Sequence, residues 1–529
     1  MKKALLLSFF SFLFLQCSSI KEHNAHLNDL ISEKKLKDDV DFTYKKLQYF
    51  QPRLYWYISK KDLDFKFDSL KNTITKPMTS FEFYKKLSPV VGSVRQGHLS
   101  VFPSVKILSK AENKAIKKKG IGPFSQFDFE IINDKMYVIK NKSDNKTIPI
   151  GAEVIAVNGK NVSELIPDYY KLFASDGYNT TWKRKRLPIR FSTFYINENG
   201  IKDSIHYTFK QNDSLKVVCI KRKKIETLKT KDTAKSISVK QKKISKKDKN
   251  TYGYNKLTKT NNRNLKFIEK DSSIAILKIR HFSLGKPSRF YKESFSKLQL
   301  YKTKTLIIDL RNNTGGALNE IADLYGYLSD STYVFIDTIQ VVSKNAIIKK
   351  TPYSTFPLVA KIALTPLYIP YAFFKTHKKD DDSYYYSNSG SKPKPIHKNA
   401  FKGKVYVMIN GGSFSASSII SSNLKGSKRA TFVGEETGGA YNGTVAGIMP
   451  TIKLPNSKVK IIIGLLATYP FYKTNIEGRG IFPDKEIIPT ITDYVNGIDP
   501  ELNWILEDIK NNSTILDENR KDKKISLKH

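Results

Sequence analysis

The serines that follow a pair of glycines near residue 412 are the residues best suited to nucleophilic chemistry. Val405–Ile409 is a short apolar, β-branched run that predicts a buried strand, and Ser415–Ser417 open a helical pattern after the glycine turn. A hydroxyl group there lies beside the unsatisfied N–H groups of a helix N-terminus, which stabilise a developing negative charge. Serines in front of a helix also serve as simple N-caps, and this segment alone does not separate the two uses.

A second segment upstream ends in a similar glycine turn. Thr305–Gly316 reads TLIIDLRNNTGG, an apolar strand followed by a polar turn that closes on two glycines. The glycines predict a loop that another group approaches closely, with free N–H groups directed at it. The alternative is a plain strand-to-helix turn, because the helical pattern LNEIADLYGYL follows. Asp309 and Arg311, which flank the turn, favour the first interpretation.

Together the two segments resemble those of tail-specific, or C-terminal-processing, serine peptidases and their tricorn-type relatives. The matching runs are D-L-R-x-N-x-G-G at Asp309–Gly316 and G-S-x-S-A-S at Gly412–Ser417. The resemblance implies that Ser415 is the nucleophile and that the backbone N–H groups of Gly316 and Ala416 form an oxyanion hole. It also implies a ClpP/crotonase-like peptidase core.

The lysine base of the bacterial processing enzymes is missing from this chain. Those enzymes carry it in a G-K-G-T turn after the nucleophile, where this sequence reads GEETGGAYNGT and Ala440 or a neighbour takes its place. Lys425 and Lys428 are the nearest lysines after Ser415, but they fall on the following helix or at its end. A serine without an activating base is a poor nucleophile, so another base is required for activity.

The tricorn-type branch uses a histidine from the N-terminal region and a glutamate after the nucleophile. His98 follows the helical pattern TSFEFYKKLSPVVG, as the catalytic histidine of that branch does, and is neutral near pH 7. The resemblance implies that His98 is the base and that Glu477, in the turn TNIEGRGIFPD, orients it. His281 lies inside a strand pattern and is the weaker candidate. A surface histidine and a solvated turn glutamate are the alternatives.

A serine that assists the histidine in tricorn-type enzymes has no counterpart directly before His98, where Gly97 stands. Ser93 or Ser100 could take this accessory role. No H-E-x-x-H or paired C-x-x-C spacing occurs, so we expect neither a metal nor another cofactor.

The N-terminal residues predict a lipid-anchored protein of the cell envelope. Ala4–Leu15 is an apolar run behind two lysines and is too short to span a bilayer, which is typical of a signal peptide. Cys17 comes just after it in a segment that resembles a bacterial lipobox. Lipidation of Cys17 would tether the chain to a membrane, on its periplasmic or outer face. Only Cys219 would remain, which excludes a disulfide framework.

The net charge of +42 does not indicate a nucleic-acid-binding protein. Lys221–Arg263 alone holds 16 lysines and arginines against three acidic residues, with almost no apolar periodicity. This segment is predicted to be a solvated linker. Aromatic residues are not interleaved with the charges, and no nucleic-acid module motif is present. Contact with an anionic membrane surface accounts for the charge as well.

The chain divides into parts that together predict a multi-domain α/β protein. IPIGAEVIAVNGKNVSELI resembles a strand-turn of PDZ domains, although a β-hairpin with its turn at Asn158-Gly159 is the alternative. The strand and helix patterns after the linker alternate, as in a peptidase core. The expected parts are a signal peptide (1–17), a helical N-terminal cap (22–105), a PDZ-like domain (118–220), the basic linker (221–263), the peptidase core (265–490) and a C-terminal tail (491–529).

One insertion in the predicted core is unusually apolar. Phe356–Phe374 contains three prolines and one lysine, so it cannot form a regular transmembrane helix. It could be a hydrophobic lid or a surface that dips into lipid. Packing in the core is the favoured alternative.

These observations predict a membrane-anchored serine endopeptidase of unfolded or tail-exposed proteins. The polypeptide substrate and the membrane are its expected partners, nucleic acid is not, and the oligomeric state is not indicated. A catalytically inactive peptidase-fold protein that binds peptides or hydrophobic ligands is the first alternative, because fold does not determine function. A basic scaffold at an anionic surface is a second.

Overall fold

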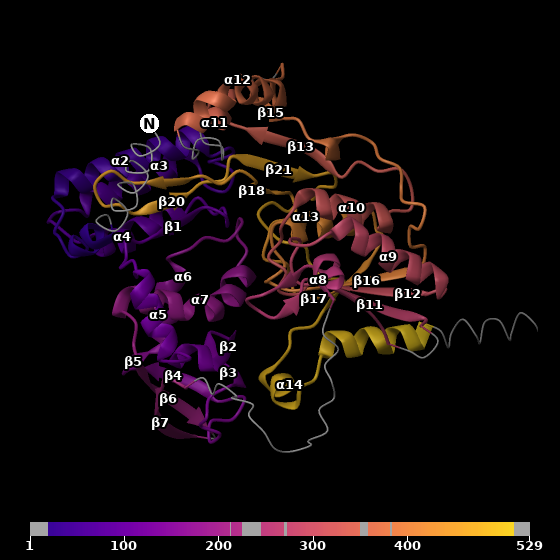
Figure 1. The fold of residues 1–529 in the computed structure, drawn as a ribbon, viewed down its shortest axis with the longest axis horizontal. Coiled ribbons are helices and arrows are strands. Elements are labelled where there is room, and N and C mark those ends of the chain that lie inside the picture. Colours follow the sequence, from indigo (N-terminus) through magenta and orange to yellow (C-terminus); the bar gives the residue numbers. More distant parts are fainter. Residues whose placement is uncertain are drawn as a thin grey trace, which may run out of the picture.

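A six-stranded sheet, built from strands between residues 263 and 486, lies in the right-hand part of this mixed α/β protein in the view of Figure 1. The computed structural model describes residues 20–211, 213–224, 245–268, 272–349, 358–380 and 383–512. Within the sheet β10 pairs antiparallel with β11, and every other pairing is parallel. Its strands, in spatial order, are β10 (Arg263–Phe267), β11 (Ile274–Ile279), β12 (Thr305–Asp309), β16 (Lys404–Ile409), β17 (Thr431–Gly434) and β22 (Lys485–Glu486).

Helices cover both faces of this sheet. Leu306 and Ile308 of β12 belong to the large core under α9 (Pro287–Leu300), α10 (Leu318–Leu328) and α13 (Ala416–Gly426). Ile307, between them, packs on the opposite face with Ile505, which belongs to a helix over residues 500–512. A strand buried on both faces reads as a continuous apolar run, which explains the sequence TLIID. The predicted C-terminal tail therefore begins with a helix that completes the core.

The N-terminal cap is helical and is attached to the core by strand pairing. It contains α2 (Glu33–Phe50), α3 (Lys60–Asn72), α4 (Ser80–Gly92) and the short β1 (Ser100–Phe102). A capping box between Thr79 and Glu82 fixes the start of α4. The strand β1 pairs with β20 (Lys460–Ile462), which pairs with β19 (Thr451–Lys453), and Figure 1 shows this contact between the two ends of the colour scale. Residue 98 is thus held between α4 and β1.

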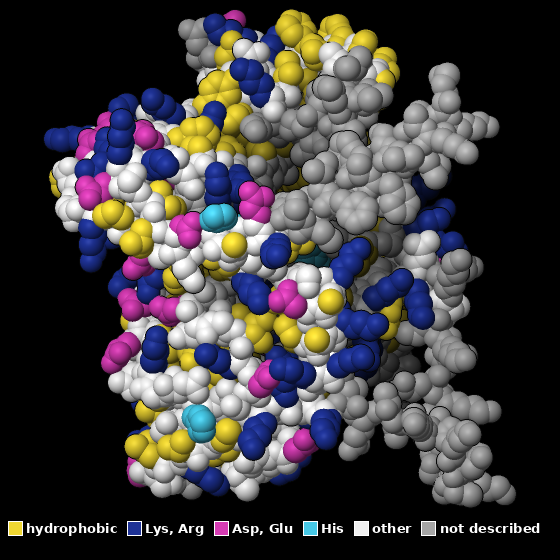
Figure 2. All heavy atoms as spheres, turned by 60° about the vertical axis from the view of Figure 1, so that its left-hand side comes forward, with side chains coloured by type: hydrophobic (Ala, Val, Ile, Leu, Met, Phe, Trp, Pro, Cys, Tyr) yellow, Lys and Arg dark blue, Asp and Glu magenta, His cyan; other side chains and the backbone are white. Residues whose placement is uncertain are grey.

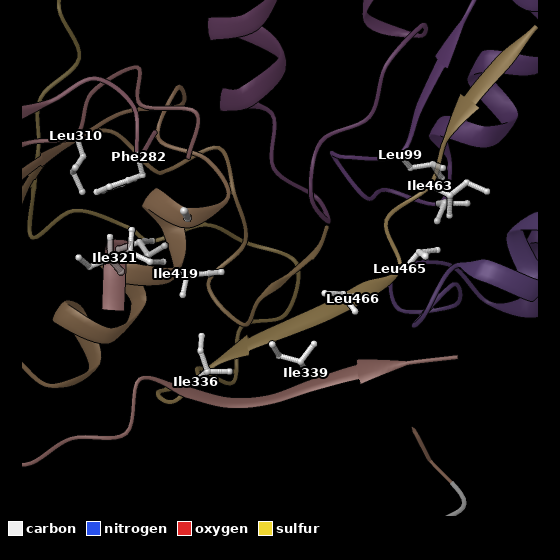
Figure 3. Packing of buried hydrophobic residues seen from close by; sticks show 14 of the residues in the cluster. Leu99, Phe282, Leu310, Ile321, Ile336, Ile339, Ile419, Ile463, Leu465 and Leu466 are labelled. Atoms are coloured by element: carbon white, nitrogen blue, oxygen red, sulfur yellow. The ribbon is translucent and has the colours of Figure 1, made fainter. Parts of the chain in front are cut away.

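A second, antiparallel sheet connects the cap to the core. Its order is β14 (Thr376–Lys378), β15 (Tyr384–Tyr386), β13 (Ile336–Val341), β21 (Leu466–Pro470) and β18 (Thr444–Ala446). Figure 3 shows side chains of one buried cluster, among them Leu99, Ile463, Leu466 and, on α13, Ile419. One hydrophobic cluster therefore fixes the position of the cap relative to the helix that follows Ser415.

The lobe after the cap is an antiparallel sheet with three α-helices. It contains α5 (Lys110–Lys118), a 3-10 turn (Pro123–Gln126), β2 (Phe127–Ile132), β3 (Lys135–Asn141), β4 (Glu153–Val157), β5 (Lys160–Asn161), α6 (Val162–Tyr170), α7 (Thr181–Asn199), β6 (Ser204–Gln211) and β7 (Ser214–Lys221). A hairpin turn lies at Asn158 and Gly159, as the alternative interpretation of this segment predicted. The assignment to the PDZ domains stays a prediction. The Ile121 N–H, before the 3-10 turn, donates to the Lys223 carbonyl oxygen at 2.8 Å.

The prediction of a solvated linker over 221–263 is wrong for its last part. Residues 225–244 lie outside the described residues. After them come α8 (Lys246–Tyr252), β8 (Tyr254–Asn255) and β9 (Thr260–Asn261). Arg263 is fully buried, because its charge is paired inside the protein.

The favoured prediction for the apolar insertion, packing in the core, is also wrong for its described side chains. The segment forms α12 (Leu358–Lys375) after the short α11 (Lys344–Lys349). Leu367 is 73% exposed and Phe374 is 80% exposed. None of the helices in the described part of the chain is long and apolar enough to cross a membrane.

The buried ion pair of Arg263 provides a test of this core. Arg263 donates to both carboxylate oxygens of Glu320, at 2.7 and 2.6 Å, and the Tyr291 hydroxyl donates to the same carboxylate at 2.9 Å. We expect Glu320→Ala to lower the free energy of unfolding by about 3–5 kcal/mol, because it leaves a buried charge unpaired. Urea unfolding followed by tryptophan fluorescence measures the loss.

The control for this variant is Glu293→Ala, which removes the partner of Arg289 in an exposed pair. It should cost less than about 1 kcal/mol. Equal losses in the two variants would show that the buried pair contributes no more than an exposed one.

Candidate active site

Ser415 occupies the turn between β16 and α13 in a backbone conformation that non-glycine residues rarely adopt. Its φ is 58° and its ψ is −119°. Such a conformation costs about 1–3 kcal/mol and persists only where the surroundings enforce it. The turn Asn313–Gly316 provides that enforcement. A Cβ atom added to Gly315 would lie 2.7 Å from the Ser415 Cβ and 2.8 Å from the Ala416 nitrogen, so only glycine fits against the serine there.

Ser415 differs from the other serines of the motif in its hydrogen bonding. Ser413 donates to the Leu310 carbonyl oxygen at 2.8 Å, and Ser417 donates to that of Asn313 at 2.8 Å. Ser418 likewise donates to a backbone carbonyl. No side-chain hydrogen bond of Ser415 is present among the described residues. Its hydroxyl is therefore available for chemistry, whereas the neighbouring hydroxyls hold the two turns together.

The predicted oxyanion donors adjoin this serine. The Gly315 N–H donates to the Asn313 side chain at 2.9 Å. In the described part of the chain, the N–H groups of Gly316 and Ala416 donate to no protein acceptor. Ala416 is the first residue of α13, so its N–H also lies at the positive end of the helix dipole. Both groups can bind a negatively charged oxygen.

His98 lies beside the residue that precedes the serine. Its ring is 4.7 Å from the ring of Phe414, measured between centroids. Its Nδ1 atom is 3.2 Å from the Thr444 hydroxyl oxygen on β18. Burial lowers the pKa of His98 to about 4, so the ring is neutral at pH 7. No hydrogen bond joins the His98 ring to the Ser415 hydroxyl in the described structure.

A buried carboxylate lies behind Thr444. The Thr444 hydroxyl donates to Asp176 Oδ2 at 3.2 Å, and the Gly97 N–H donates to Oδ1 at 2.7 Å. Asp176 is 2% exposed, and burial raises its pKa to about 6 against the effect of these donors. Above that pH the ionised group accepts hydrogen bonds only. No sequence motif pointed to Asp176, which lies in the turn before α7.

Glu477 lies elsewhere than the resemblance implied. Its exposed carboxylate accepts from Asn442 Nδ2 at 2.9 Å and from Trp56 Nε1 at 3.2 Å. The described residues contain no hydrogen bond between Glu477 and His98. The turn that carries Glu477 faces the cap instead, where Glu477 contacts Trp56. No direct contact with His98 in the described structure supports the orienting role predicted for Glu477.

The other candidate residues are bound away from the serine. His281 bonds to the Ser283 hydroxyl at 2.7 Å. Lys425 pairs with Asp484, and Lys428 follows the end of α13.

The two serines considered for the accessory role also lie elsewhere. The Ser93 hydroxyl donates to the carbonyl of Val90 on its own helix, and Ser100 belongs to β1. Thr444 holds the position next to His98 that was considered for these two serines. Ala440, in the place of the family lysine, is buried, and its N–H faces Asp176 at 3.5 Å.

Asp309 and Arg311, which suggested a reactive turn, serve the core instead. Arg311 donates to Asp309 and, at 2.8 Å, to both carboxylate oxygens of Asp499. Burial would raise the pKa of Asp309, but Arg311 and Lys278 hold it below its usual value. These pairs tie the end of β12 to the C-terminal helix.

A cavity of about 930 Å³ lies between the cap and the turn that carries Asp176. Trp56, Tyr57 and Tyr178 give it aromatic walls, and Arg95 and Lys183 add positive charge. Ser415 and His98 are not among its lining residues. The Tyr57 hydroxyl is buried without a hydrogen-bond partner, and burial together with the charges of Asp176 and Glu477 raises its pKa.

The described residues form no candidate metal centre. No group of three or more histidine, cysteine, aspartate or glutamate side chains there could hold a metal ion. Cys219 is a free, exposed thiol on β7, and Cys17 lies outside the described residues.

Comparison with known proteins finds a peptidase family over part of the chain. Residues 273–487 match peptidase family S41. The tail-specific protease of Haemophilus influenzae (strain ATCC 51907 / DSM 11121 / KW20 / Rd) is 28% identical over 174 residues, which are 33% of this chain and 18% of that protein. The chain thus spans less than a fifth of the length of this curated relative.

Solved structures show the same fold over most of the chain. Mature CPAF is 15% identical, with 88% of this chain and 94% of that chain covered and a TM-score of 0.54. Mature CPAF complexed with lactacystin is 16% identical, with 92% and 99% covered and a TM-score of 0.57. The predicted α/β fold class and the resemblance to tail-specific peptidases are confirmed. The match to peptidase family S41 therefore covers the part of the chain that carries both glycine turns and Ser415.

Proposed function

We propose that this chain is a serine endopeptidase that hydrolyses unfolded or tail-exposed polypeptides, with Ser415 as nucleophile and His98 as base. The relay from Asp176 through Thr444 to His98 is the observation that carries the proposal. Because an ionised Asp176 only accepts, the single hydroxyl proton of Thr444 is donated to it. The Thr444 oxygen then accepts from His98 Nδ1–H. Neutral His98 therefore presents an unprotonated Nε2, which is the form that a general base needs.

In this mechanism Ser415 attacks the carbonyl carbon of the scissile peptide bond while His98 Nε2 takes its hydroxyl proton. The N–H groups of Gly316 and Ala416 bind the oxyanion that forms. His98 then gives the proton to the leaving amine, and a water molecule hydrolyses the acyl-enzyme by the same steps in reverse. The Asp176 carboxylate stabilises the imidazolium through Thr444 without receiving its proton. The missing family lysine is not required in this scheme.

A non-catalytic peptide-binding protein is the second candidate. Two observations favour it. In the described structure Ser415 and His98 share no hydrogen bond, and an aromatic cavity lies beside Asp176. Catalytic hydrogen bonds often tighten only when substrate binds, so the first candidate accounts for both observations.

We also propose that Cys17 carries a lipid and anchors the protein in the cell envelope. The signal-like sequence before Cys17 and the net charge of +42, suited to an anionic membrane surface, support this location.

The nucleophile is tested by Ser415→Ala. This variant should fold as the wild type does and lose proteolysis of an unstructured protein by several orders of magnitude, because no other free hydroxyl occupies the turn. Ser417→Ala and Ser418→Ala should keep most activity, although each loses a buried hydrogen bond worth about 1 kcal/mol. Cleavage of casein and thermal unfolding measure the two effects. An active Ser415→Ala protein would exclude this mechanism.

The base is tested by the pH dependence of kcat/KM. A base works only when unprotonated, so activity through His98 should be lost as the pH falls through about 4, not through the usual value near ~6.5. Protonation of Asp176 below about pH 6 reverses the direction of the Thr444 hydrogen bond, which should add a shoulder there. His98→Ala should be as inactive as Ser415→Ala. A pH profile of kcat/KM with one inflection, near ~6.5, would show that water reaches the His98 ring freely.

The orienting acid is tested by comparing Asp176→Asn with Glu477→Gln. Asn at 176 places an amide donor against the Thr444 hydroxyl, so kcat should fall by ~100-fold or more with little change in KM, and the shoulder near pH 6 should vanish. Glu477→Gln should cost less than about tenfold, since its carboxylate is exposed. The opposite ranking would return the orienting role to Glu477.

A further inference from the structure

The helix α12 has its exposed side covered with apolar side chains. Leu364, Leu367, Ile369, Tyr371, Phe373 and Phe374 are all large and exposed. Figure 2 shows hydrophobic side chains gathered at the top of the molecule, where Figure 1 places α12. A helix on a water-soluble surface ordinarily turns its apolar stripe inward and its polar side outward. This helix carries apolar side chains on its outer side as well, so that side is suited to a partner that is not water.

Among the described side chains of α12, one narrow stripe is buried or partly buried against the protein. Ala372 is buried, and Thr365 and Tyr368 are partly buried, at the spacing of one helix face. Tyr368 packs against the large hydrophobic core. The described residues between 363 and 374 that lie off this stripe are exposed. The helix is therefore held firmly along one side while the other side stays open.

Lysines border the apolar surface. The sequence from 344 to 379 contains seven lysines and no acidic residue, and none of the lysines falls between 362 and 374. Lys344 Nζ lies 3.6 Å from the ring centroid of Phe373, and Lys375 Nζ lies 5.8 Å from that of Tyr371. Three aspartates follow at 380–382. An apolar patch with aromatic side chains and a lysine border is the composition of a helix that lies in a membrane interface.

We propose that α12 docks this protein on an anionic lipid bilayer, with its outer side inserted among the lipid head groups and upper acyl chains. The prolines at 366 and 370 and the limited length of the helix fit a helix that lies in the surface, not one that crosses it. The positive charge of the lysines that border the apolar surface favours an anionic partner. A second copy of the chain is disfavoured, because a symmetric contact between two such faces would bring like-charged lysines together. This helix would add a second membrane contact to the lipid anchor proposed at Cys17.

The test separates the helix from the lipid anchor. The mature chain, residues 17–529 with Cys17→Ser, is sedimented with vesicles of phosphatidylethanolamine and phosphatidylglycerol. We expect it to bind them, and to bind phosphatidylcholine vesicles and the anionic vesicles in high salt at least ~10-fold more weakly. Leu367→Ser with Phe374→Ser should lower the vesicle partition coefficient by ~10-fold or more, because both side chains would leave the lipid.

The matched control is Leu300→Ser with Phe65→Ser. Leu300 is as exposed as Leu367, at 73%, and Phe65 is 71% exposed, but neither belongs to α12. This control should bind vesicles like the Cys17→Ser chain, and both double variants should unfold at the same temperature. Equal loss in the two double variants, or no vesicle binding by the Cys17→Ser chain, would overturn the proposal. A dimer in sedimentation velocity that only the α12 variant breaks would overturn it too, in favour of a second copy. Incorporation of labelled fatty acid by the wild type, and not by Cys17→Ser, checks the anchor.

Discussion

The Thr444 hydroxyl has one proton, and the direction in which it points decides what the rest of the site can do. Toward an ionised Asp176, it leaves the Thr444 oxygen to accept from His98 Nδ1, and Nε2 of the ring stays free of a proton. Toward His98, it would leave Nε2 protonated. In the proposed mechanism the buried carboxylate thus controls the tautomer of the histidine through a neutral residue. Its raised pKa, about 6, sets the pH at which that control fails.

This relay exists only because three distant parts of the chain meet. His98 lies between the cap helix α4 and β1, Asp176 precedes α7, and Thr444 belongs to β18. The pairing of β1 with β20 and the hydrophobic cluster from Leu99 to Ile419 bring them together. The cap is therefore part of the site and not an accessory to it. Any change that loosens the β1–β20 contact should move His98 before it unfolds the core.

The elements that local pattern defines were predictable, and those that depend on distant partners were not. The buried strands β12 and β16, the helix after Ser415 and the two glycine turns follow from apolar runs and glycine positions. Residues 245–263 read as a solvated linker, because the sequence does not show that Arg263 finds Glu320 across the core. The insertion at 356–374 read as core on composition alone. Whether an apolar helix is covered depends on what packs over it, which no single segment contains.

Asp176, which contacts His98 through Thr444, shows the same limit of prediction from sequence within the site. Ser415, His98, Gly316 and Ala416 lie in motifs whose spacing is local, so the sequence alone could nominate them. An orienting carboxylate needs no motif, because it acts through hydrogen bonds that any buried aspartate or glutamate can make from any loop. Glu477 has the local signal, but its carboxylate bonds to Trp56 and Asn442. Asp176 has no such signal, yet it has the burial, the raised pKa and the contact with Thr444. The geometry of the network, and not the position of a residue in the sequence, identifies the group that can orient His98.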